Sequence, residues 1–401
     1  MEGERMHAAS TATDDVKARV KELLGKMSAE EKADLLTGLD MSHFKGVQRL
    51  GVPSMRVTDC GHGVTLTGDE RPVCGTCFPT AVGQASTWNR QLIGEMGAAL
   101  GREVRALGCS MLLGPMVNIH RLPLGGRNYE TYSEDPFLAG RMAAALVRGI
   151  QSQGVGACVK GFTANNQQAE QTTTSAEIDE RTLREIYCPA FRIPIRENPP
   201  FAVMTSYNLV NGQHTSENAH LVRDVVKDDW GYDGVVLSDW RGVHSTAAIA
   251  AGLDLEMPGP GKCLTKQNLL RAVEAGVIDE DELNDRARRV LEMVLKCTAD
   301  ADAAGEVDSP RHRELARRVA EELIVLLKND RSVLPLDADG MRSVAVIGPN
   351  AEQARLGGGG SASVCPPYSV GVLDGIVNRC GSDVKVLYAE GDDVEVLTTM
   401  A

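Results

Sequence analysis

The chain has 401 residues, of which 43% are hydrophobic and 24% are charged, and its formal net charge is −13. This length is typical of two domains, or of one barrel with a smaller unit. The acidic balance and the absence of any dense Lys/Arg run argue against nucleic acid or an acidic membrane as partner, because binding phosphate requires basic patches.

The sequence indicates neither a targeting or membrane segment nor a metal site. The first 20 residues contain no apolar core of a signal peptide, and no segment approaches 18 uninterrupted apolar residues. We therefore expect a cytoplasmic protein that does not enter membranes. The ten cysteines are scattered, and the closest pair, Cys74 and Cys77, has no second pair at zinc-finger spacing. We expect reduced thiols and no metal or cofactor, with a redox role of this pair as the alternative.

Helix and strand patterns alternate over the first 300 residues. Residues 14–36 have helical periodicity, and Ser28 and Glu31 are spaced as a capping box. Regular alternation of strands and helices predicts an α/β fold whose parallel sheet closes into a (β/α)8 TIM-like barrel over residues 1–297, with an open doubly wound sheet as the alternative. Buried strands are predicted at 54–59, 111–119, 154–162, 200–208 and 235–237, and helices at 89–107 and 136–153.

A change of pattern near residue 300 indicates a second unit. The segment "CTADADAAGEV" (297–307) is small and acidic, so residues 298–312 are a predicted linker. A helix over 313–330, a strand over 343–349 and the glycine run Gly357–Gly360 follow. One strand–helix–strand unit is too little to bury a parallel sheet by itself, and we expect exposed strand edges there.

Polar side chains accumulate where the predicted strands end. If the strands form a barrel, these side chains converge on one mouth, where the active sites of such barrels lie. Each also has a structural interpretation: Asp239 would suit a helix N-cap, and Arg127 a buried ion pair with Glu134. The residues concerned are Asp59, Asn118 with Arg121, Arg127, Lys160, Tyr207 with Asn208, and Asp239 with Trp240.

The chemistry of this set suits a polyhydroxylated ligand. Charged side chains bind sugar hydroxyls through paired hydrogen bonds, and an aromatic face packs against the C–H groups of the ring. A carboxylate among them is a candidate glycosidic nucleophile. Lys160 and Arg127 nearby would keep such a carboxylate ionised.

Several long motifs resemble those of the family 3 glycoside hydrolases, particularly the β-glucosidase-like members. They include "TDCGHG" (58–63), "LLGPMVNIHRLPLGGRNYETYSEDPFLAG" (112–140), "VMTSYNLVNGQHTSEN" (203–218), "GVVLSDW" (234–240) and "AGLDLEMPG" (251–259). The resemblance implies an N-terminal barrel over residues 1–297 and a C-terminal α/β sandwich, of which residues 313–401 are an incomplete start.

The resemblance also implies roles for individual residues. Asp239 matches the catalytic nucleophile that forms a covalent glycosyl-enzyme. Three positions depart from the family pattern: Gly161 stands in place of a His, and Gln171 and Thr65 in place of Arg. Residues matching the sugar subsite are Asp59, Arg127, Lys160, Met204, Tyr207 and Trp240, with Ser361 from the second domain.

The general acid/base glutamate of the family is not identifiable. Glu390 and Glu395 lie near the end of the chain, but neither sits in a matching motif. The leading hypothesis is a retaining hydrolase of β-glucosides or related small glycosides, impaired if the acid/base region is missing. The alternative is a non-catalytic carbohydrate-binding or regulatory pseudo-glycosidase. A homo-oligomer, or a partner that completes the C-terminal domain, is a further expectation.

Overall fold

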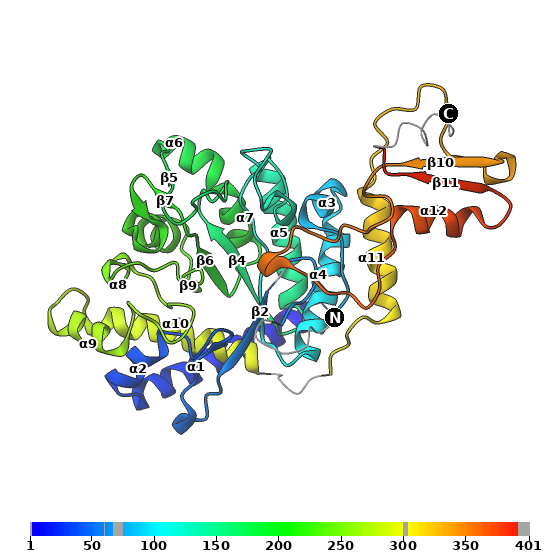
Figure 1. The fold of residues 1–401 in the computed structure, drawn as a ribbon. Helices are drawn as coiled ribbons and strands as arrows, with labels where there is room; N and C mark the ends of the chain where they lie inside the picture. The colour runs from blue at the N-terminus through cyan, green and yellow to red at the C-terminus, as the bar shows by residue number, and fades with distance from the viewer. Residues whose placement is uncertain (1, 60, 67–74, 300–303, 392–401) are drawn as a thin grey trace.

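The computed structural model describes residues 2–59, 61–66, 75–299 and 304–391. A main unit, residues 2–299, consists of a curled sheet surrounded by helices. A second unit, residues 343–391, projects to one side, with helix α11 (Pro310–Leu323) between the two (Figure 1).

The sheet of the main unit has the strand order β1-β2-β3-β4-β6-β9. Its strands from β2 to β9 are parallel, whereas the short β1 is antiparallel to β2. Isolated bridges lead from β9 to Leu255, from Glu256 to Thr37, and from Gly38 to β1, so that the sheet curls back on itself. The strands are β1 (His43–Phe44), β2 (Met55–Asp59), β3 (Met111–Leu113), β4 (Gly156–Phe162), β6 (Ala202–Thr205) and β9 (Val235–Leu237).

Helices cover the outside of this sheet, and many begin at a residue whose side chain caps them. Asn89 caps α4, Asp135 caps α5, and both Ser28 and Asp279 form complete capping boxes. The helices of the main unit are α1 (Glu2–Lys26), α2 (Ala29–Leu35), α3 (Ala81–Ser86), α4 (Arg90–Ala106), α5 (Pro136–Gln151), α6 (Glu180–Thr182), α7 (Pro189–Glu197), α8 (Ala247–Ala251), α9 (Lys266–Glu274) and α10 (Glu280–Thr298), with π-helical η3 (Leu183–Tyr187) and η5 (His220–Asp229).

Short elements complete the main unit. The 3-10 turns are η1 (Gln48–Leu50), η2 (Asn128–Glu130) and η4 (Thr215–Glu217). A small three-stranded sheet is formed by β5 (Ser175–Ala176), β7 (Leu209–Val210) and β8 (Gln213–His214).

The α/β class predicted from the sequence is confirmed, and a strand lies within each of the five predicted strand segments. The predicted capping box of Ser28 and Glu31 is present as well. The box begins a new helix inside the segment of helical periodicity, residues 14–36: α1 ends at Lys26 and α2 follows. The eightfold repeat of the barrel stays a prediction.

The predicted helix over 313–330 is too long. Helix α11 ends at Leu323, and the four consecutive apolar residues 324–327 belong to no helix or strand and are exposed, Leu327 to 91%. Four apolar residues in a row cannot all lie on one face of a helix, so the run is more typical of a strand. Within the described ranges, no helix combines the length and the apolar character that crossing a membrane requires.

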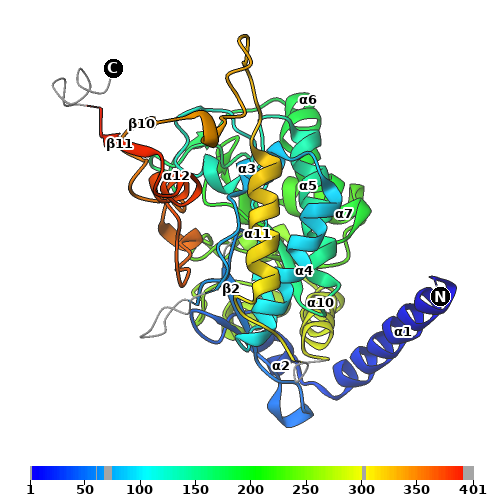
Figure 2. The same cartoon turned by 90° about the vertical axis from the view of Figure 1, so that its right-hand side faces the viewer.

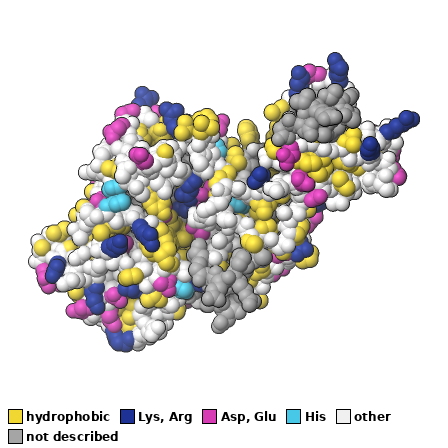
Figure 3. Space-filling view, viewed as in Figure 1, with side chains coloured by type: hydrophobic (Ala, Val, Ile, Leu, Met, Phe, Trp, Pro, Cys, Tyr) yellow, Lys and Arg dark blue, Asp and Glu magenta, His cyan; other side chains and the backbone are white. Residues whose placement is uncertain are grey.

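The second unit contains the parallel strands β10 (Ser343–Ile347) and β11 (Lys385–Ala389) and the helix α12 (Val372–Cys380), with the turns η6 (Ala338–Gly340) before it and η7 (Gly360–Ala362) inside it. Much of its apolar surface is exposed, and Figure 3 shows hydrophobic side chains gathered on it. The exposed side chains here and in the segment before it are Ile324, Val325, Leu326, Leu327, Val333, Leu334, Leu336, Ile347, Tyr368, Val370, Val372 and Val377.

We expect this surface to make the chain associate, because exposed apolar patches and unpaired strand edges favour contact between molecules. Size-exclusion chromatography with light scattering should show a mass that rises with concentration, and Leu326→Ser/Leu327→Ser should shift it towards the monomer. Leu124→Ser, which removes an exposed leucine of the main unit, is the control. A wild-type chain that stays monomeric at all concentrations would contradict the prediction.

Helix α11 runs beside α3 and α4 (Figure 2), and a buried carboxylate joins it to the main unit. Glu103 of α4 is fully buried and accepts hydrogen bonds from His312 Nδ1 (2.9 Å), the Asp308 backbone (3.0 Å), and both the backbone and hydroxyl of Thr76 (3.0 and 2.6 Å). A second contact between the same helices, Glu95 with Arg318 at 3.2 Å, is exposed to solvent.

Glu103→Ala should lower the free energy of unfolding by about 3 kcal/mol or more, since it leaves several buried donors without their acceptor. Glu95→Ala is the matched control on the same helix and should cost no more than about 1 kcal/mol, as is typical of exposed ion pairs. Urea denaturation followed by circular dichroism measures both. Equal losses in the two variants would show that the buried cluster does not hold α11.

Candidate active site

The register of the parallel strands aligns the predicted site residues. Asp59, the last residue of β2, pairs with Leu113 of β3, and Lys160 of β4 pairs with Met204 of β6. Met204 in turn pairs with Leu237, the last residue of β9, which is two residues before Asp239. Because all these strands run in the same direction, their side chains meet at the carboxyl-terminal edge of the sheet.

A cavity of about 220 Å³ lies at this edge. The eight residues predicted from the sequence as nucleophile or sugar contacts all line it, including Ser361 from the second unit. The chain segment with η7, orange in Figure 1, runs back from the second unit to the main unit and brings Ser361 there. The lining residues are Met41, Val57, Thr58, Asp59, Leu113, Arg127, Lys160, Met204, Tyr207, Asp239, Trp240 and Ser361.

Paired charges form the polar wall of this cavity. Lys160 Nζ lies 2.6 Å from Asp59 Oδ1 and 3.0 Å from Glu130 Oε1. Arg127 makes two hydrogen bonds to Glu130, of 2.7 and 2.9 Å, and this fork geometry fixes the guanidinium plane. The alternative structural interpretation, a buried Arg127–Glu134 ion pair, is wrong, because Glu134 is exposed and Arg127 pairs with Glu130.

Glu130 is the charged residue that sequence reasoning missed. It is buried beneath the cavity, where η2 turns it towards Arg127. Burial disfavours its ionised form, but the charges of Lys160 and Arg127 outweigh burial and lower the pKa of Glu130 to about 2. Burial likewise opposes the charge of Lys160, yet Asp59 and Glu130 raise its pKa overall. The spacing Arg-x-x-Glu in "RNYE" was the available signal.

Asp239 is almost fully buried, and burial raises its pKa above the ordinary value. Four groups work against that shift: the charges of Arg127 and Lys160, a hydrogen bond with the Tyr207 side chain, and the backbone N–H of Trp240, which donates to Asp239 Oδ1 at 2.7 Å. The carboxylate is therefore desolvated but surrounded by groups that favour its charge.

Apolar and aromatic side chains also line the cavity. Trp240 Nε1 donates to the backbone carbonyl of Met41 at 2.8 Å, and this bond fixes the orientation of the indole. Met41, Val57, Thr58 and Leu113 were not among the predicted residues. Met41 lies in a loop without a recognisable pattern, whereas the other three belong to buried strands, in which the sequence does not distinguish cavity-facing from core positions.

The three positions that depart from the family pattern lie outside the lining of the cavity. At Gly161 the backbone has φ of +91°, and a β-carbon there would collide with the side-chain oxygen of Asn118. Asn118 Nδ2 donates to the Gly161 carbonyl at 2.8 Å, so that this amide occupies the space beside the glycine. The Thr65 hydroxyl donates to the carbonyl of Ser363 in the second unit, and Gln171 is half-buried.

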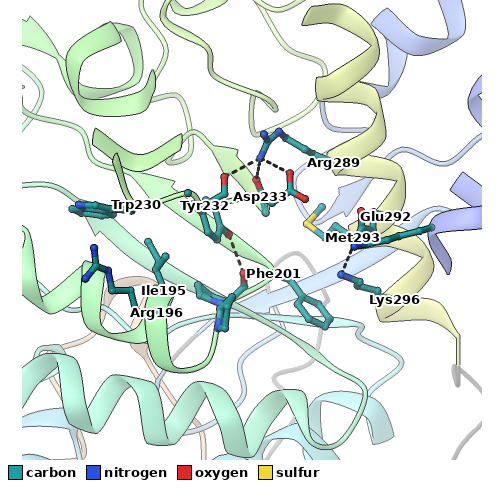
Figure 4. A pocket seen from close by; sticks show the side chains of 15 residues that line it. Ile195, Arg196, Phe201, Trp230, Tyr232, Asp233, Arg289, Glu292, Met293 and Lys296 are labelled. Atoms are coloured by element: carbon teal, nitrogen blue, oxygen red, sulfur yellow. Dashed lines mark hydrogen bonds and ion pairs between the residues drawn. The ribbon is translucent and has the colours of Figure 1, made fainter. Parts of the chain in front are cut away.

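A larger cavity, of about 460 Å³, lies at the opposite end of β6 and β9 (Figure 4). Its polar groups are largely paired with one another: Arg289 donates to the carbonyl groups of Tyr232 and Gly234, and Lys296 forms an ion pair with Glu292. Groups that already have partners gain little from a ligand, because binding would only exchange one hydrogen bond for another. Size alone therefore does not make this cavity the candidate site.

The residues that the structure describes offer little support for a metal site or for a reactive thiol. No three side chains of His, Cys, Asp or Glu are grouped there as a metal site requires. Cys77 belongs to the pair for which a redox role was the alternative to reduced thiols. It is largely shielded, and burial raises its pKa to about 11, which disfavours the reactive thiolate. Its partner Cys74 lies outside the described residues.

The cavity brings together carboxylates, cations and an indole, the kinds of group that suit a polyhydroxylated ligand. The family comparison agrees. The model of the glycosyl hydrolase family 3 N terminal domain matches residues 19–293, and that of the corresponding C-terminal domain matches residues 324–400. The chain therefore belongs to glycosyl hydrolase family 3.

Several relatives of the chain are named β-glucosidases. The chain is 41% identical over 384 residues to thermostable β-glucosidase B of Acetivibrio thermocellus, covering 94% of this chain and 50% of the relative. It is 45% identical over 366 residues to a β-glucosidase of Rhizobium radiobacter, covering 89% and 44%. The solved structure of Kluyveromyces marxianus β-glucosidase in complex with glucose aligns with a TM-score of 0.86 at 36% identity, covering 92% and 45%. The chain spans about half the length of these relatives.

The raised pKa of Asp239 predicts how the stability of the folded chain depends on pH. A carboxyl group whose pKa is higher in the folded state contributes stability at low pH that is lost as the pH rises through the folded value. Asp239→Asn should therefore raise the melting temperature at pH 7, and the gain should shrink as the pH is lowered towards the ordinary pKa of aspartate. Thermal unfolding of both proteins over this pH range measures the difference.

Asp59→Asn is the matched control, because Asp59 is also a carboxylate of the cavity but forms an ion pair with the buried Lys160. Loss of the Asp59 charge should lower the free energy of unfolding by about 3 kcal/mol, as is typical when one partner of a buried ion pair is removed. A destabilised Asp239→Asn variant at pH 7 would mean that burial does not dominate the energetics of this carboxylate.

Proposed function

We propose that this chain provides the sugar subsite and the nucleophile of a retaining β-glucosidase, acting on β-glucosides or related small glycosides. The observation that carries the proposal is the single cavity in which Asp239 lies together with Arg127, Lys160, Tyr207 and Trp240. The β-glucosidase relatives, one of them solved with glucose, support the choice of sugar.

In the proposed first step, a carboxylate oxygen of Asp239 attacks the anomeric carbon, and the bond from this carbon to the aglycone oxygen breaks. The aglycone leaves with the electron pair and takes up a proton. In the second step, water loses a proton, attacks the same carbon and releases Asp239. Asp59 and Lys160 would hold the sugar hydroxyls, and the indole of Trp240 would face the ring.

The two proton transfers require a second carboxyl group about 5–5.5 Å from the nucleophile. Among the described residues that line the cavity, the other carboxylate is Asp59, and its ion pair with Lys160 suits hydrogen-bond acceptance better than proton donation. Glu390 is exposed and does not line the cavity, and Glu395 lies outside the described residues. We propose that further polypeptide, or a partner chain docked on the apolar surface of the second unit, supplies the acid/base.

A substrate whose leaving group needs no proton isolates the first step. Incubation with 2,4-dinitrophenyl 2-deoxy-2-fluoro-β-glucoside should add one fluoroglucosyl group, which intact-protein mass spectrometry detects and peptide mapping assigns to Asp239. The rate should fall as the pH is lowered, beginning above the ordinary pKa of aspartate, because burial raises the pKa of Asp239 and the protonated carboxyl does not attack.

Asp239→Asn should form no adduct, whereas Asp233→Asn should react like the wild type, since Asp233 is an exposed carboxylate outside this cavity. An adduct on another residue would refute the assignment of the nucleophile.

The second candidate is a carbohydrate-binding protein without catalysis. It is favoured by Gly161, whose conformation leaves no room for the side chain that the family pattern expects, and by the lack of a free second carboxylate among the described lining residues. Glucose binding in calorimetry that survives Asp239→Asn, without an adduct in any fluorosugar experiment, would support this candidate over the first.

A further inference from the structure

We propose that Tyr129 and Thr65 are positioning residues, which hold the glycine-rich loop, residues 356–364, against the main unit and so place Ser361 at the sugar cavity. The inference rests on the proposed function, because it concerns the same site. Neither residue lines the cavity, whereas Ser361 does. Both would therefore act on the ligand only through the loop.

Two hydrogen bonds attach the loop on either side of Ser361. The Tyr129 hydroxyl donates to the carbonyl of Gly359 at 2.7 Å, and the Thr65 hydroxyl donates to the carbonyl of Ser363. Each acceptor lies two residues from Ser361, one before it and one after it. The position of this serine is thus set by bonds to the main unit.

The ring of Tyr129 also packs against the backbone of the loop. A β-carbon on Gly358 would overlap this ring, so the backbone of the loop lies directly on it. Gly359 has φ of +84°, which only glycine adopts at little cost. The ring meets His62 edge-on at 6.3 Å between centroids, and the imidazole of His62 hydrogen-bonds the backbone of Leu356.

A run of four glycines has little tendency to keep one conformation, because glycine loses more backbone freedom on ordering than any other residue. Inside the loop, Ser363 N–H bonds to the Gly360 carbonyl at 3.1 Å and closes the single turn η7. One such turn does not fix the direction of the loop relative to the cavity. The contacts with Tyr129 and Thr65 supply that direction.

The test uses the fluoroglucoside reaction at varied concentration, which separates the half-saturating concentration from the maximal rate. Tyr129→Phe and Thr65→Val should each raise the half-saturating concentration by about three- to tenfold, the factor that one neutral hydrogen bond supplies, and leave the maximal rate almost unchanged. Thr65→Ser, which keeps the hydroxyl, should behave like the wild type.

A double-mutant cycle shows whether the effect passes through Ser361. Ser361→Ala should cause a similar loss, and adding Tyr129→Phe to it should cause little further loss. Tyr187→Phe, at a tyrosine away from the cavity, is the control and should change nothing. The proposal is overturned if Tyr129→Phe reacts like the wild type, or if the losses of Tyr129→Phe and Ser361→Ala multiply.

Hydrogen exchange of the loop amides distinguishes this inference from the proposed function. If the wild type forms no adduct, the nucleophile assignment fails, and the loop is judged by exchange alone. Residues 356–364 should exchange faster in Tyr129→Phe than in the wild type and in Tyr187→Phe. Equal exchange in the three proteins would overturn the positioning role.

Discussion

The cluster of Lys160, Arg127, Asp59 and Glu130 is the constraint around which the site is built. Two cations and two carboxylates are held at the end of the sheet with little access to water, and each is tolerated there because the others neutralise it. Asp239 adds a third negative charge to this balanced set. The site therefore holds one carboxylate more than its cations neutralise, and this surplus is the group proposed to react.

The same arrangement explains why binding and reaction are assigned to different carboxylates. Asp59 and Glu130 are engaged by cations at 2.6 to 3.0 Å, so their lone pairs are already partly used. Asp239 is held by Tyr207 and a backbone N–H, which orient it without neutralising its charge. Preorganised dipoles of this kind favour an attacking carboxylate in a water-poor site.

Many of the residues that line the cavity could be predicted from the sequence, for a physical reason. Buried parallel strands are short, continuous apolar runs, so residues such as Asp59 and Asp239 stand out where the runs end. The chemistry of the set followed from the residue types, but the roles of Met204 and Ser361 depended on the family resemblance. For Glu130 the sequence offered only the local spacing to Arg127, because its second partner, Lys160, comes near it only through the three-dimensional fold.

The bond between Thr65 and Ser363 joins residues 298 positions apart in the chain. During synthesis the amino-terminal part of a protein generally folds first. The sheet, the cation–carboxylate cluster and Asp239 are then complete while the glycine-rich loop has yet to leave the ribosome. The cavity is consequently one of the last parts of the molecule to form, and a nascent main unit presents Asp239 in an open groove.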